Sequence, residues 1–271
     1  MTAAPTGAHQ QAAARIRCDW GLPGATAISE GAGVVVVVDV LSFTTTLSVA
    51  VENDLVVHPY LFRDASAASF AAQRGAMLAV GRSEAGETGI SLSPLSIRRA
   101  VEQGRLSPGD ALVLPSPNGS AISKRLADGD AAVVGACLRN ARSVAAWAWA
   151  HAGDRPIAVV AAGERWPGDQ LRPAVEDLWG AGAVIAALLD AGLQGASPEA
   201  EAAAAGYRAL LDPLGVHTVQ ESVPAMLRAC ASGQELIGDG WGDEIDVAAE
   251  LDMSTAVPVL DGEVFRAGSL P

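Results

Sequence analysis

Residues 33–46 read Gly-Val-Val-Val-Val-Val-Asp-Val-Leu-Ser-Phe-Thr-Thr-Thr. Five consecutive valines without polar alternation predict a strand over residues 34–40 that is buried on both faces, as in a parallel sheet covered by helices. Asp39 lies where this strand ends, and three threonines follow at the start of a predicted helix. In open α/β sheets, ligands bind outside the carboxyl ends of the strands. A functional site is therefore expected around Asp39.

The composition indicates a globular protein with an acidic surface. Half of the 271 residues are hydrophobic, which is enough for a sizeable core. The net charge of −13 repels phosphate backbones and anionic lipid heads, which argues against nucleic-acid and membrane partners. A small anionic ligand is compatible with this charge only if a metal ion or a local group of arginines reverses the sign inside the pocket.

The N-terminus and the cysteines bear on the expected location. Residues 1–14 are Ala-rich and lack the basic start and apolar core of a signal peptide, so a loose N-terminal extension is expected. No apolar stretch approaches the roughly 20 residues that a membrane-spanning helix needs. Cys18, Cys137 and Cys230 are widely spaced, which is typical of buried thiols in a reducing compartment. A cytoplasmic location is expected.

Strands followed by polar loops and helices recur along the chain. This alternation predicts an α/β fold with a mostly parallel or mixed sheet and helices on both faces. Residues 15–271 are expected to form a single α/β domain, in which the helix-rich residues 193–252 form either a helical subdomain or helices that cover one face of the same sheet. The expected strands are 34–40, 55–57, 77–80, 111–114, 131–134, 157–161, 256–260 and, as a hairpin partner, 262–265; the expected helices include 44–53, 65–74, 174–190, 198–211, 223–231 and 243–251.

Polar side chains follow five of the expected strands. Because parallel strands bring such loops to one edge of a sheet, a single cleft can receive them. Each group also has a simpler interpretation, since Thr, Asn and Ser cap helices and form turns, and acidic residues at a helix start complement its dipole. The groups are Asp39 with Thr44, Thr45 and Thr46; Arg82 with Glu84; Asn118 with Gly119 and Ser120; Arg139 with Asn140; Glu164 with Arg165; and, at a helix start, Glu176 with Asp177.

Templates for several other chemistries are absent from the sequence. There is no histidine pair at i,i+4, no dinucleotide fingerprint after a strand, no P-loop and no G-x-S-x-G elbow. An aspartyl nucleophile of the haloacid-dehalogenase type requires a second Asp two residues after the first, where this chain has Leu41. The remaining chemistry is attack by water assisted by a hard cation such as Mg²⁺, which carboxylates hold.

Taken in order, these loops resemble the 2-phosphosulfolactate phosphatase family. The resemblance spans roughly Gly33 to Asp261. It implies an α/β fold and magnesium-dependent hydrolysis of (2R)-phospho-3-sulfolactate, a small anionic phosphorylated substrate, to 3-sulfolactate and phosphate on the route to coenzyme M. It is also compatible with a homo-oligomer. The shared motifs are VVDVLxxTTT at 37–46, GxxE at 81–84, PNGS at 117–120, AG at 162–163, VEDLxxAGA at 175–183, SGxEL at 232–236 and LDxSxxVPVL at 251–260.

The resemblance carries functional positions onto this chain, and the roles within them are inferred. Asp39, Glu176 and Asp177 are predicted to be catalytic. The predicted Mg²⁺ ligands are Asp39, Glu84, Glu164 and Glu176. The predicted substrate and phosphate contacts are Thr44, Thr45, Thr46, Arg82, Asn118, Gly119, Ser120, Arg139, Asn140 and Arg165, with Arg139 or Arg165 meeting the second anionic group of the substrate; Gly163, Gly240 and Glu244 also match the family pattern.

Several positions depart from the family's usual pattern. Ser42 and Leu92 stand where Arg and Asn are usual, and Glu244 replaces an Asp. The acid and base that follow Gly81 are also rearranged. Ser does not reproduce the fork geometry with which Arg binds anions. Two alternatives therefore stay open: a related enzyme of the same fold with a different small anionic substrate, and a catalytically silent binding or scaffold homologue.

Overall fold

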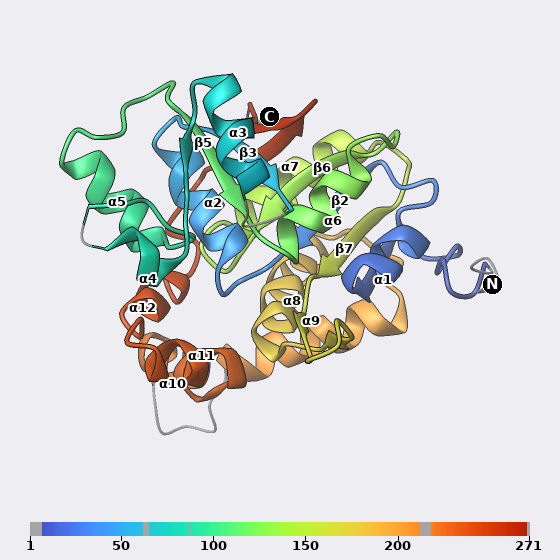
Figure 1. Ribbon diagram of the computed structural model, residues 1–271. Coiled ribbons are helices and arrows are strands. Elements are labelled where there is room, and N and C mark those ends of the chain that lie inside the picture. Colours follow the sequence, from blue (N-terminus) through green and yellow to red (C-terminus); the bar gives the residue numbers. More distant parts are fainter. Residues whose placement is uncertain (1–6, 62–64, 87, 212–217, 270–271) are drawn as a thin grey trace.

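The valine run lies near the centre of one half of a nine-stranded sheet (Figure 1). The computed structural model describes residues 7–61, 65–86, 88–211 and 218–269. In the described residues the strand order is β1-β7-β2-β6-β10-β11-β3-β5-β4, and β8 and β9 form a separate hairpin. The strands are β1 (Ile16–Trp20), β2 (Val34–Val38), β3 (Val56–Tyr60), β4 (Met77–Leu78), β5 (Ala111–Pro115), β6 (Ala132–Ala136), β7 (Ile157–Ala161), β8 (Glu164–Arg165), β9 (Leu171–Arg172), β10 (Pro258–Asp261) and β11 (Val264–Ala267).

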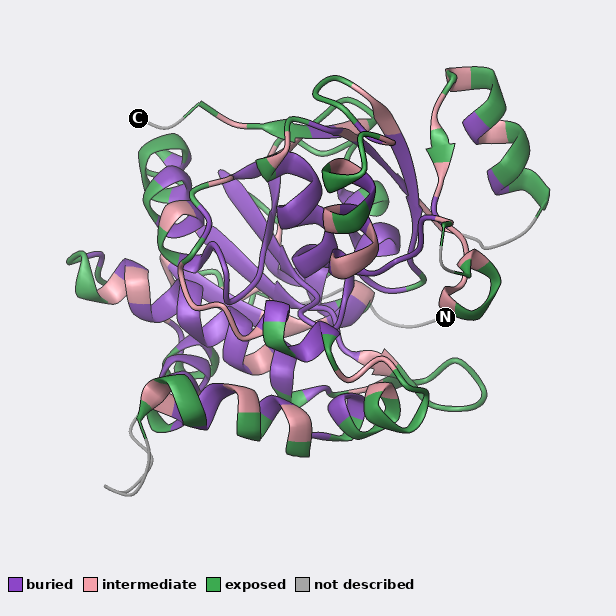
Figure 2. Cartoon of the chain, turned by 90° about the vertical axis from the view of Figure 1, so that its left-hand side faces the viewer, coloured by how far each residue is buried: buried purple, intermediate pink, exposed green. Residues whose placement is uncertain are grey.

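Helices cover both faces of this sheet, as the sequence predicts. Val36 of β2 packs in one hydrophobic cluster with α7 and α8, whereas Val35 packs in another with α1 and α6. Figure 2 shows the strands buried and the exposed residues on the outer surfaces. The helices are α1 (Gly21–Ile28), α2 (Phe43–Glu52), α3 (Ala65–Arg74), α4 (Arg82–Ala85), α5 (Pro94–Glu102), α6 (Gly119–Leu126), α7 (Ala141–Ala152), α8 (Val175–Asp190), α9 (Pro198–Leu211), α10 (Val219–Ala229), α11 (Ala231–Gly238) and α12 (Glu244–Ala248).

The sheet joins two parallel sets of strands that run in opposite directions. The β10–β11 hairpin is antiparallel to β6 on one side and to β3 on the other, which reverses β3, β5 and β4 relative to β1, β7, β2 and β6. Five steps in strand order separate β2 from β5. The loops that follow β2 and β5 nonetheless meet, because Gly119 N donates to Asp39 Oδ2 at 2.9 Å.

The helices of residues 193–252 share the core of the sheet. Ala203 of α9, Leu227 of α10 and Ile245 of α12 belong to the same hydrophobic cluster as Val36 of β2. The contact between α8 and α9 depends on Gly182, where a Cβ would lie 2.1 Å from the Ala203 carbonyl oxygen. These helices therefore pack in the same hydrophobic cluster as strands of the sheet.

Some elements differ from those that the sequence predicts. β1, α1 and α5 lie in segments where no element is expected, and the expected strand 77–80 shortens to β4. The expected helix 223–231 is replaced by α10 and α11, which meet at Cys230. Residues 7–14 are attached to β1, because the Gln11 side chain bonds the backbone of Cys18 through both its oxygen and its nitrogen, at 3.0 and 2.7 Å.

Candidate active site

Asp39 is held by backbone amides from both halves of the sheet. Its Oδ1 accepts a hydrogen bond from Phe43 N at 3.0 Å, and its Oδ2 accepts one from Gly119 N at 2.9 Å. The carboxyl is buried, at 5% exposure. Position 119 requires glycine, because a Cβ there would lie 2.3 Å from Phe43 Cδ1 and 2.8 Å from Asp39 Oδ2. The structure thus brings Asp39 and the loop of Asn118 and Gly119 together.

The hydroxyl groups around Asp39 mostly bond the main chain. Thr44 Oγ1 accepts from Asp39 N at 2.9 Å and donates to Asp39 O at 2.7 Å. Thr45 Oγ1 donates to the carbonyl oxygen five residues earlier, and Ser120 Oγ donates to the one six residues earlier. Thr46 Oγ1 is buried and has no hydrogen-bond partner among the described residues. Thr44, Thr45 and Ser120 therefore shape the loops, and the structure does not offer their hydrogens to phosphate.

Glu176 and Asp177 begin α8 and are both buried. Asp177 accepts from Val40 N at 2.7 Å and from Gly163 N at 2.8 Å, so it joins the loops that follow β2 and β7. Gly163 adopts a φ of 68°, which favours glycine. Glu176 lies near the Cys230 thiol, which donates to Leu227 O at 3.1 Å. Asp177 is therefore placed to position the loops, while Glu176 remains a candidate ligand or base.

Glu164 is oriented by Asn118 at the start of the β8–β9 hairpin. Asn118 Nδ2 donates to Glu164 Oε2 at 2.9 Å, and Asn118 Oδ1 accepts from Arg165 Nε at 3.1 Å. The other two guanidinium nitrogens of Arg165 donate to Asp169 and to the carbonyl oxygen of Pro117. Arg165 therefore orients Asn118, because each of its nitrogens already has a partner.

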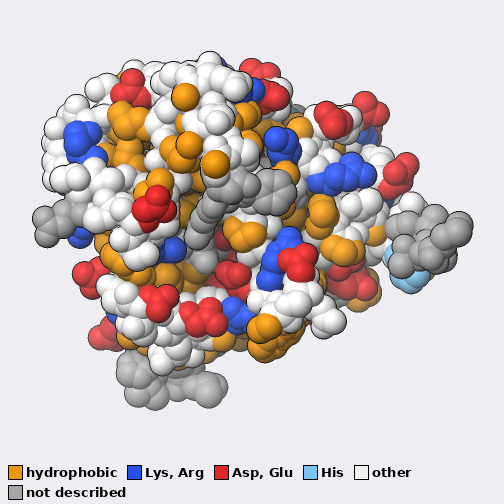
Figure 3. Space-filling model, viewed as in Figure 1, with side chains coloured by type: hydrophobic (Ala, Val, Ile, Leu, Met, Phe, Trp, Pro, Cys, Tyr) orange, Lys and Arg blue, Asp and Glu red, His pale blue; other side chains and the backbone are white. Residues whose placement is uncertain are grey.

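A pocket of about 250 Å³ borders Glu164, Asn118 and Arg165. Its other walls come from the start of α1, from α6 and from the β8–β9 hairpin, and most of them are apolar. On the face of the molecule seen in Figure 3, acidic and basic side chains are intermixed. The pocket thus gives the Glu164–Asn118 pair an opening at the surface.

Asp39, Glu164, Glu176 and Asp177, called the acidic cluster below, interact electrostatically. Burial raises the pKa of Asp39, and repulsion from Glu176 adds to this effect, against the two backbone amides that lower it. Burial, with repulsion from Asp39 and Glu176, raises the pKa of Asp177 well above its ordinary value. The pKa of Glu164 is raised to about 7, first by burial and then by Asp39. A cation among these carboxylates would stabilise their ionised forms.

The acidic cluster fits Mg²⁺ by donor type and by charge. Within the described part of the chain, no group of three or more His, Cys, Asp or Glu side chains is arranged to hold a metal ion. Mg²⁺, however, usually keeps several waters and is bound through only one or two carboxylates. The fit is therefore to an ion with few direct protein ligands, and not to a closed protein cage.

Arg82 reaches the loop after Asp39 from α4. Its Nε and Nη2 donate to the Glu244 carboxylate of α12 at 2.8 to 3.1 Å, and Nη2 also donates to Ser42 Oγ at 2.7 Å. Figure 1 shows α4 and α12 next to each other. Glu84, on the same short helix as Arg82, is exposed and bonds no member of the acidic cluster among the described contacts. Arg82 thus contacts the loop that follows Asp39, whereas Glu84 makes no such contact among the described residues.

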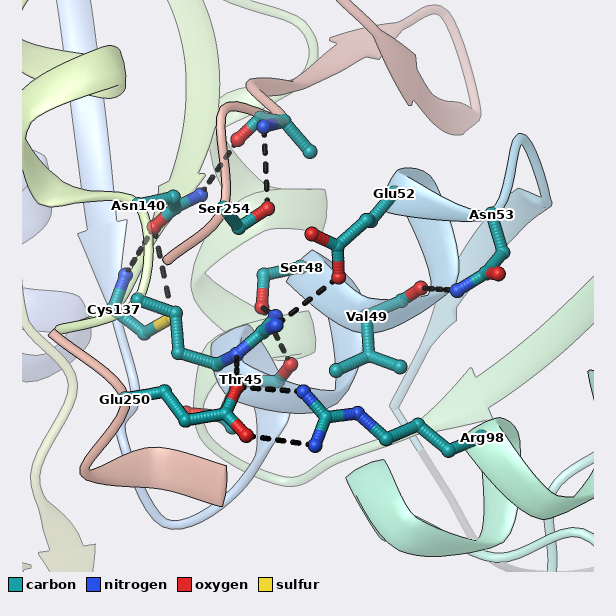
Figure 4. Close-up of polar contacts among 12 residues, drawn as sticks. Thr45, Ser48, Val49, Glu52, Asn53, Arg98, Cys137, Asn140, Glu250 and Ser254 are labelled. Atoms are coloured by element: carbon teal, nitrogen blue, oxygen red, sulfur yellow. Dashed lines mark hydrogen bonds and ion pairs between the residues drawn. The ribbon is translucent and has the colours of Figure 1, made fainter. Parts of the chain in front are cut away.

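Arg139 and Asn140 belong to a different polar network (Figure 4). Arg139 is 2% exposed, and its three guanidinium nitrogens donate to Glu250, Ser48 and Glu52. Asn140 bonds mainly backbone atoms. This network joins α2, α5 and the segment after α12. Arg139 is enclosed in this network and bonds no member of the acidic residues around Asp39 among the described contacts, so the structure does not bring it to the place expected from the sequence.

Two residues near the acidic cluster are not identified from the sequence. Arg172 lies opposite Glu164 in the β8–β9 register and donates to Glu235 at 3.2 Å. Cys230 accepts from Gly233 N at 3.4 Å, and burial together with the nearby Glu176 raises the pKa of its thiol to about 12. The SGxEL motif at 232–236 is the one sequence sign that α11 approaches the site.

A family model for 2-phosphosulpholactate phosphatase matches residues 23–263. The matched span covers most of the chain and includes the whole acidic cluster. The chain belongs to this family. It is therefore a phosphatase, a phosphoric monoester hydrolase, and its substrate is a small phosphorylated compound. Among the described residues, no helix has both the length and the apolar character needed to cross a membrane.

Proposed function

We propose that the protein hydrolyses (2R)-phospho-3-sulfolactate to 3-sulfolactate and phosphate, with Mg²⁺ bound at the acidic cluster. The observation that carries this proposal is the meeting of buried Asp39, Glu176 and Asp177 with half-buried Glu164, from the ends of β2 and β7 and the start of α8. The ester carries a phosphate, a carboxylate and a sulfonate. Without a cation, the acidic cluster would repel all three groups.

Asp39 and Glu176 would hold the ion. Asp39 is fixed by Phe43 N and Gly119 N, and each of its oxygens keeps a lone pair beyond the amide bond that it accepts. When bound, Mg²⁺ neutralises phosphate oxygens and lowers the pKa of a bound water. The protein itself sets the geometry of the site, since Asp177 holds the loops that carry Asp39 and Glu164 in place relative to each other.

Glu164 would move the proton. In the metal-free protein its pKa of about 7 lets both of its forms exist near neutral pH, which suits a general acid or base. Asn118 holds its Oε2 at 2.9 Å, and Arg165 fixes Asn118 in turn. Glu164 thus takes a proton from the attacking water or returns one to the leaving oxygen of sulfolactate, while the phosphorus–oxygen ester bond breaks.

The proposal is tested by phosphate release from (2R)-phospho-3-sulfolactate, with Mg²⁺ and with chelator. We expect turnover only with Mg²⁺, and its loss in Asp39→Asn. The control is Asp190→Asn, since Asp190 is exposed and pairs only with Arg208 on the surface. Equal release with Mg²⁺ and with chelator, or full activity in Asp39→Asn, would contradict the proposal. A silent homologue would release no phosphate and show no change in melting temperature with Mg²⁺ and sulfolactate.

We also infer a cytoplasmic location and a role in the formation of coenzyme M. Cys18, Cys137 and Cys230 are free and buried, which suits a reducing compartment. The family resemblance implies that the product, 3-sulfolactate, lies on the route to coenzyme M. Measuring sulfolactate in cells that lack the protein tests the role, since an unchanged level would contradict it.

A further inference from the structure

The guanidinium of Arg82 is held at one edge and free at one nitrogen. Glu244 accepts from Nε and Nη2, which fixes the plane of the group. Nη1 has no hydrogen-bond partner among the described residues, so both of its hydrogens remain to be donated. The Arg82 side chain is 17% exposed and that of Glu244 is 4% exposed, so the pair is enclosed but open on one side.

Ser42 provides a further donor beside Nη1. Its Oγ accepts from Arg82 Nη2 at 2.7 Å, and no described contact uses its own hydrogen. Ser42 immediately precedes Phe43, whose backbone amide holds Asp39. The two hydrogens of Nη1 and the Ser42 hydroxyl are therefore three donors next to the loop that carries Asp39.

We propose that Arg82 and Ser42 bind the sulfonate of the substrate, an inference that rests on the proposed function. The flat edge of Arg82 that matches a carboxylate is taken by Glu244, and Ser42 occupies the other edge at Nη2. The remaining donors, on Arg82 Nη1 and Ser42 Oγ, do not form a flat pair. They suit the three oxygens of a sulfonate better than the two coplanar oxygens of a carboxylate. Glu244 is a positioning residue in this arrangement.

The other arginines near the site are less suited to this task. Arg139 is enclosed, and Arg165 uses all three nitrogens to hold Asn118 and the hairpin. Arg172 pairs with Glu164 in the β8–β9 register and bonds Ser232 and Glu235 of α11 through Nη2. Arg82 alone among these four bonds the loop that begins at Asp39.

The test compares four phosphate esters in the presence of Mg²⁺. They are 2-phosphosulfolactate, 2-phosphooxyethanesulfonate, which has only the sulfonate, 2-phospholactate, which has only the carboxylate, and 4-nitrophenyl phosphate, which has neither. In Arg82→Met we expect kcat/KM to fall roughly tenfold to hundredfold for the two sulfonates, mainly through KM. For the other two esters we expect a change within about threefold. Ser42→Ala should show the same selectivity with a smaller loss.

The control is Arg74→Met, which removes the same charge from an Arg–Glu pair on α3 and should leave all four rates unchanged. Arg82→Lys keeps a cation and should restore part of the sulfonate rate, and it also serves if Arg82→Met fails to fold. An equal loss for all four esters, or a loss confined to 2-phospholactate, would overturn the assignment.

If the wild-type protein hydrolyses none of them, the proposed function fails. Titration calorimetry with 3-sulfolactate and lactate then decides, because weaker binding of sulfolactate alone in Arg82→Met would still support the inference and equal binding would refute it.

Discussion

Glu164→Gln is expected to stabilise the metal-free protein above neutral pH. The pKa of Glu164 is raised from its ordinary 4.5 to about 7, by burial first, then by Asp39, and also by Glu176. At roughly 1.4 kcal/mol per pKa unit, this rise corresponds to an upper limit of about 3 kcal/mol. Because the folded pKa lies above the unfolded one, the stabilising contribution is complete below about pH 4.5 and is lost as the pH rises through about 7. Gln keeps an oxygen for Asn118 and carries no charge.

Urea unfolding in chelator between pH 5 and 8.5 measures this effect. We expect the free energy of unfolding of the variant to exceed that of the wild type by up to about 3 kcal/mol at pH 8, and the difference to shrink or reverse near pH 5. Asp39 and Asp177 also have raised pKa values, but they are present in both proteins and largely cancel in the comparison. Glu84→Gln, at an exposed position on α4, is the control and should change stability by less than about 0.5 kcal/mol.

If the difference in unfolding free energy between Glu164→Gln and wild type does not vary with pH, the assignment of the raised pKa to Glu164 is refuted. So would a variant that is less stable than the wild type at pH 8. Mg²⁺ extends the experiment, since a cation that binds only the folded protein raises its stability. The melting temperature should rise more with Mg²⁺ in the wild type than in the variant, because the wild type has one more carboxylate to neutralise.

Three further substitutions test the packing around the site. Gly119→Ala should reduce kcat/KM at least tenfold and lower the melting temperature, because the new Cβ overlaps Phe43 and displaces the amide that holds Asp39; unchanged kinetics would contradict this role. Gly206→Ala, where a Cβ meets nothing within 4 Å in α9, should instead stabilise the protein by about 0.5–1 kcal/mol in urea unfolding. Arg139→Met should lower the unfolding free energy by about 1–3 kcal/mol, because it leaves the buried Ser48 hydroxyl without its donor and removes the partner of part-exposed Glu52, and a cost under about 0.5 kcal/mol would show that the network is dispensable.

The main parts of the fold follow from local patterns in the sequence. The valine run predicts a strand buried on both faces, and Val35 and Val36 do pack in separate clusters. The hairpin predicted at 256–265 also forms, as β10 and β11. Its place in the sheet, between β6 and β3, could not be predicted, because single pairings such as Val259 with Val134 depend on tertiary packing.

From the sequence, the location of the site could be predicted only as the loops that follow certain strands. Asp39 and Gly119 meet because both follow sheet strands, and position in an α/β fold carries that information. The sequence could not predict in this way which arginines contact the site. A guanidinium at the end of a long side chain can turn toward several partners, and only the folded structure shows that Glu250 and Glu52 take up Arg139 while Arg82 keeps Nη1 free.

The distribution of charge explains why so acidic a protein can handle an anionic ester. The acidic cluster concentrates carboxylates where a cation would be held, and the ionised forms of Asp39, Glu164 and Asp177 are destabilised until a cation arrives. Arg82 forms a bidentate pair with Glu244, and this pairing leaves the donors of Nη1 without a protein partner among the described residues. Glu244 in turn depends on α12, whose Ile245 packs in the common core. In the proposed arrangement, the sulfonate is bound by Arg82, whose orientation is set by the C-terminal helices, and the phosphate is bound at the sheet edge.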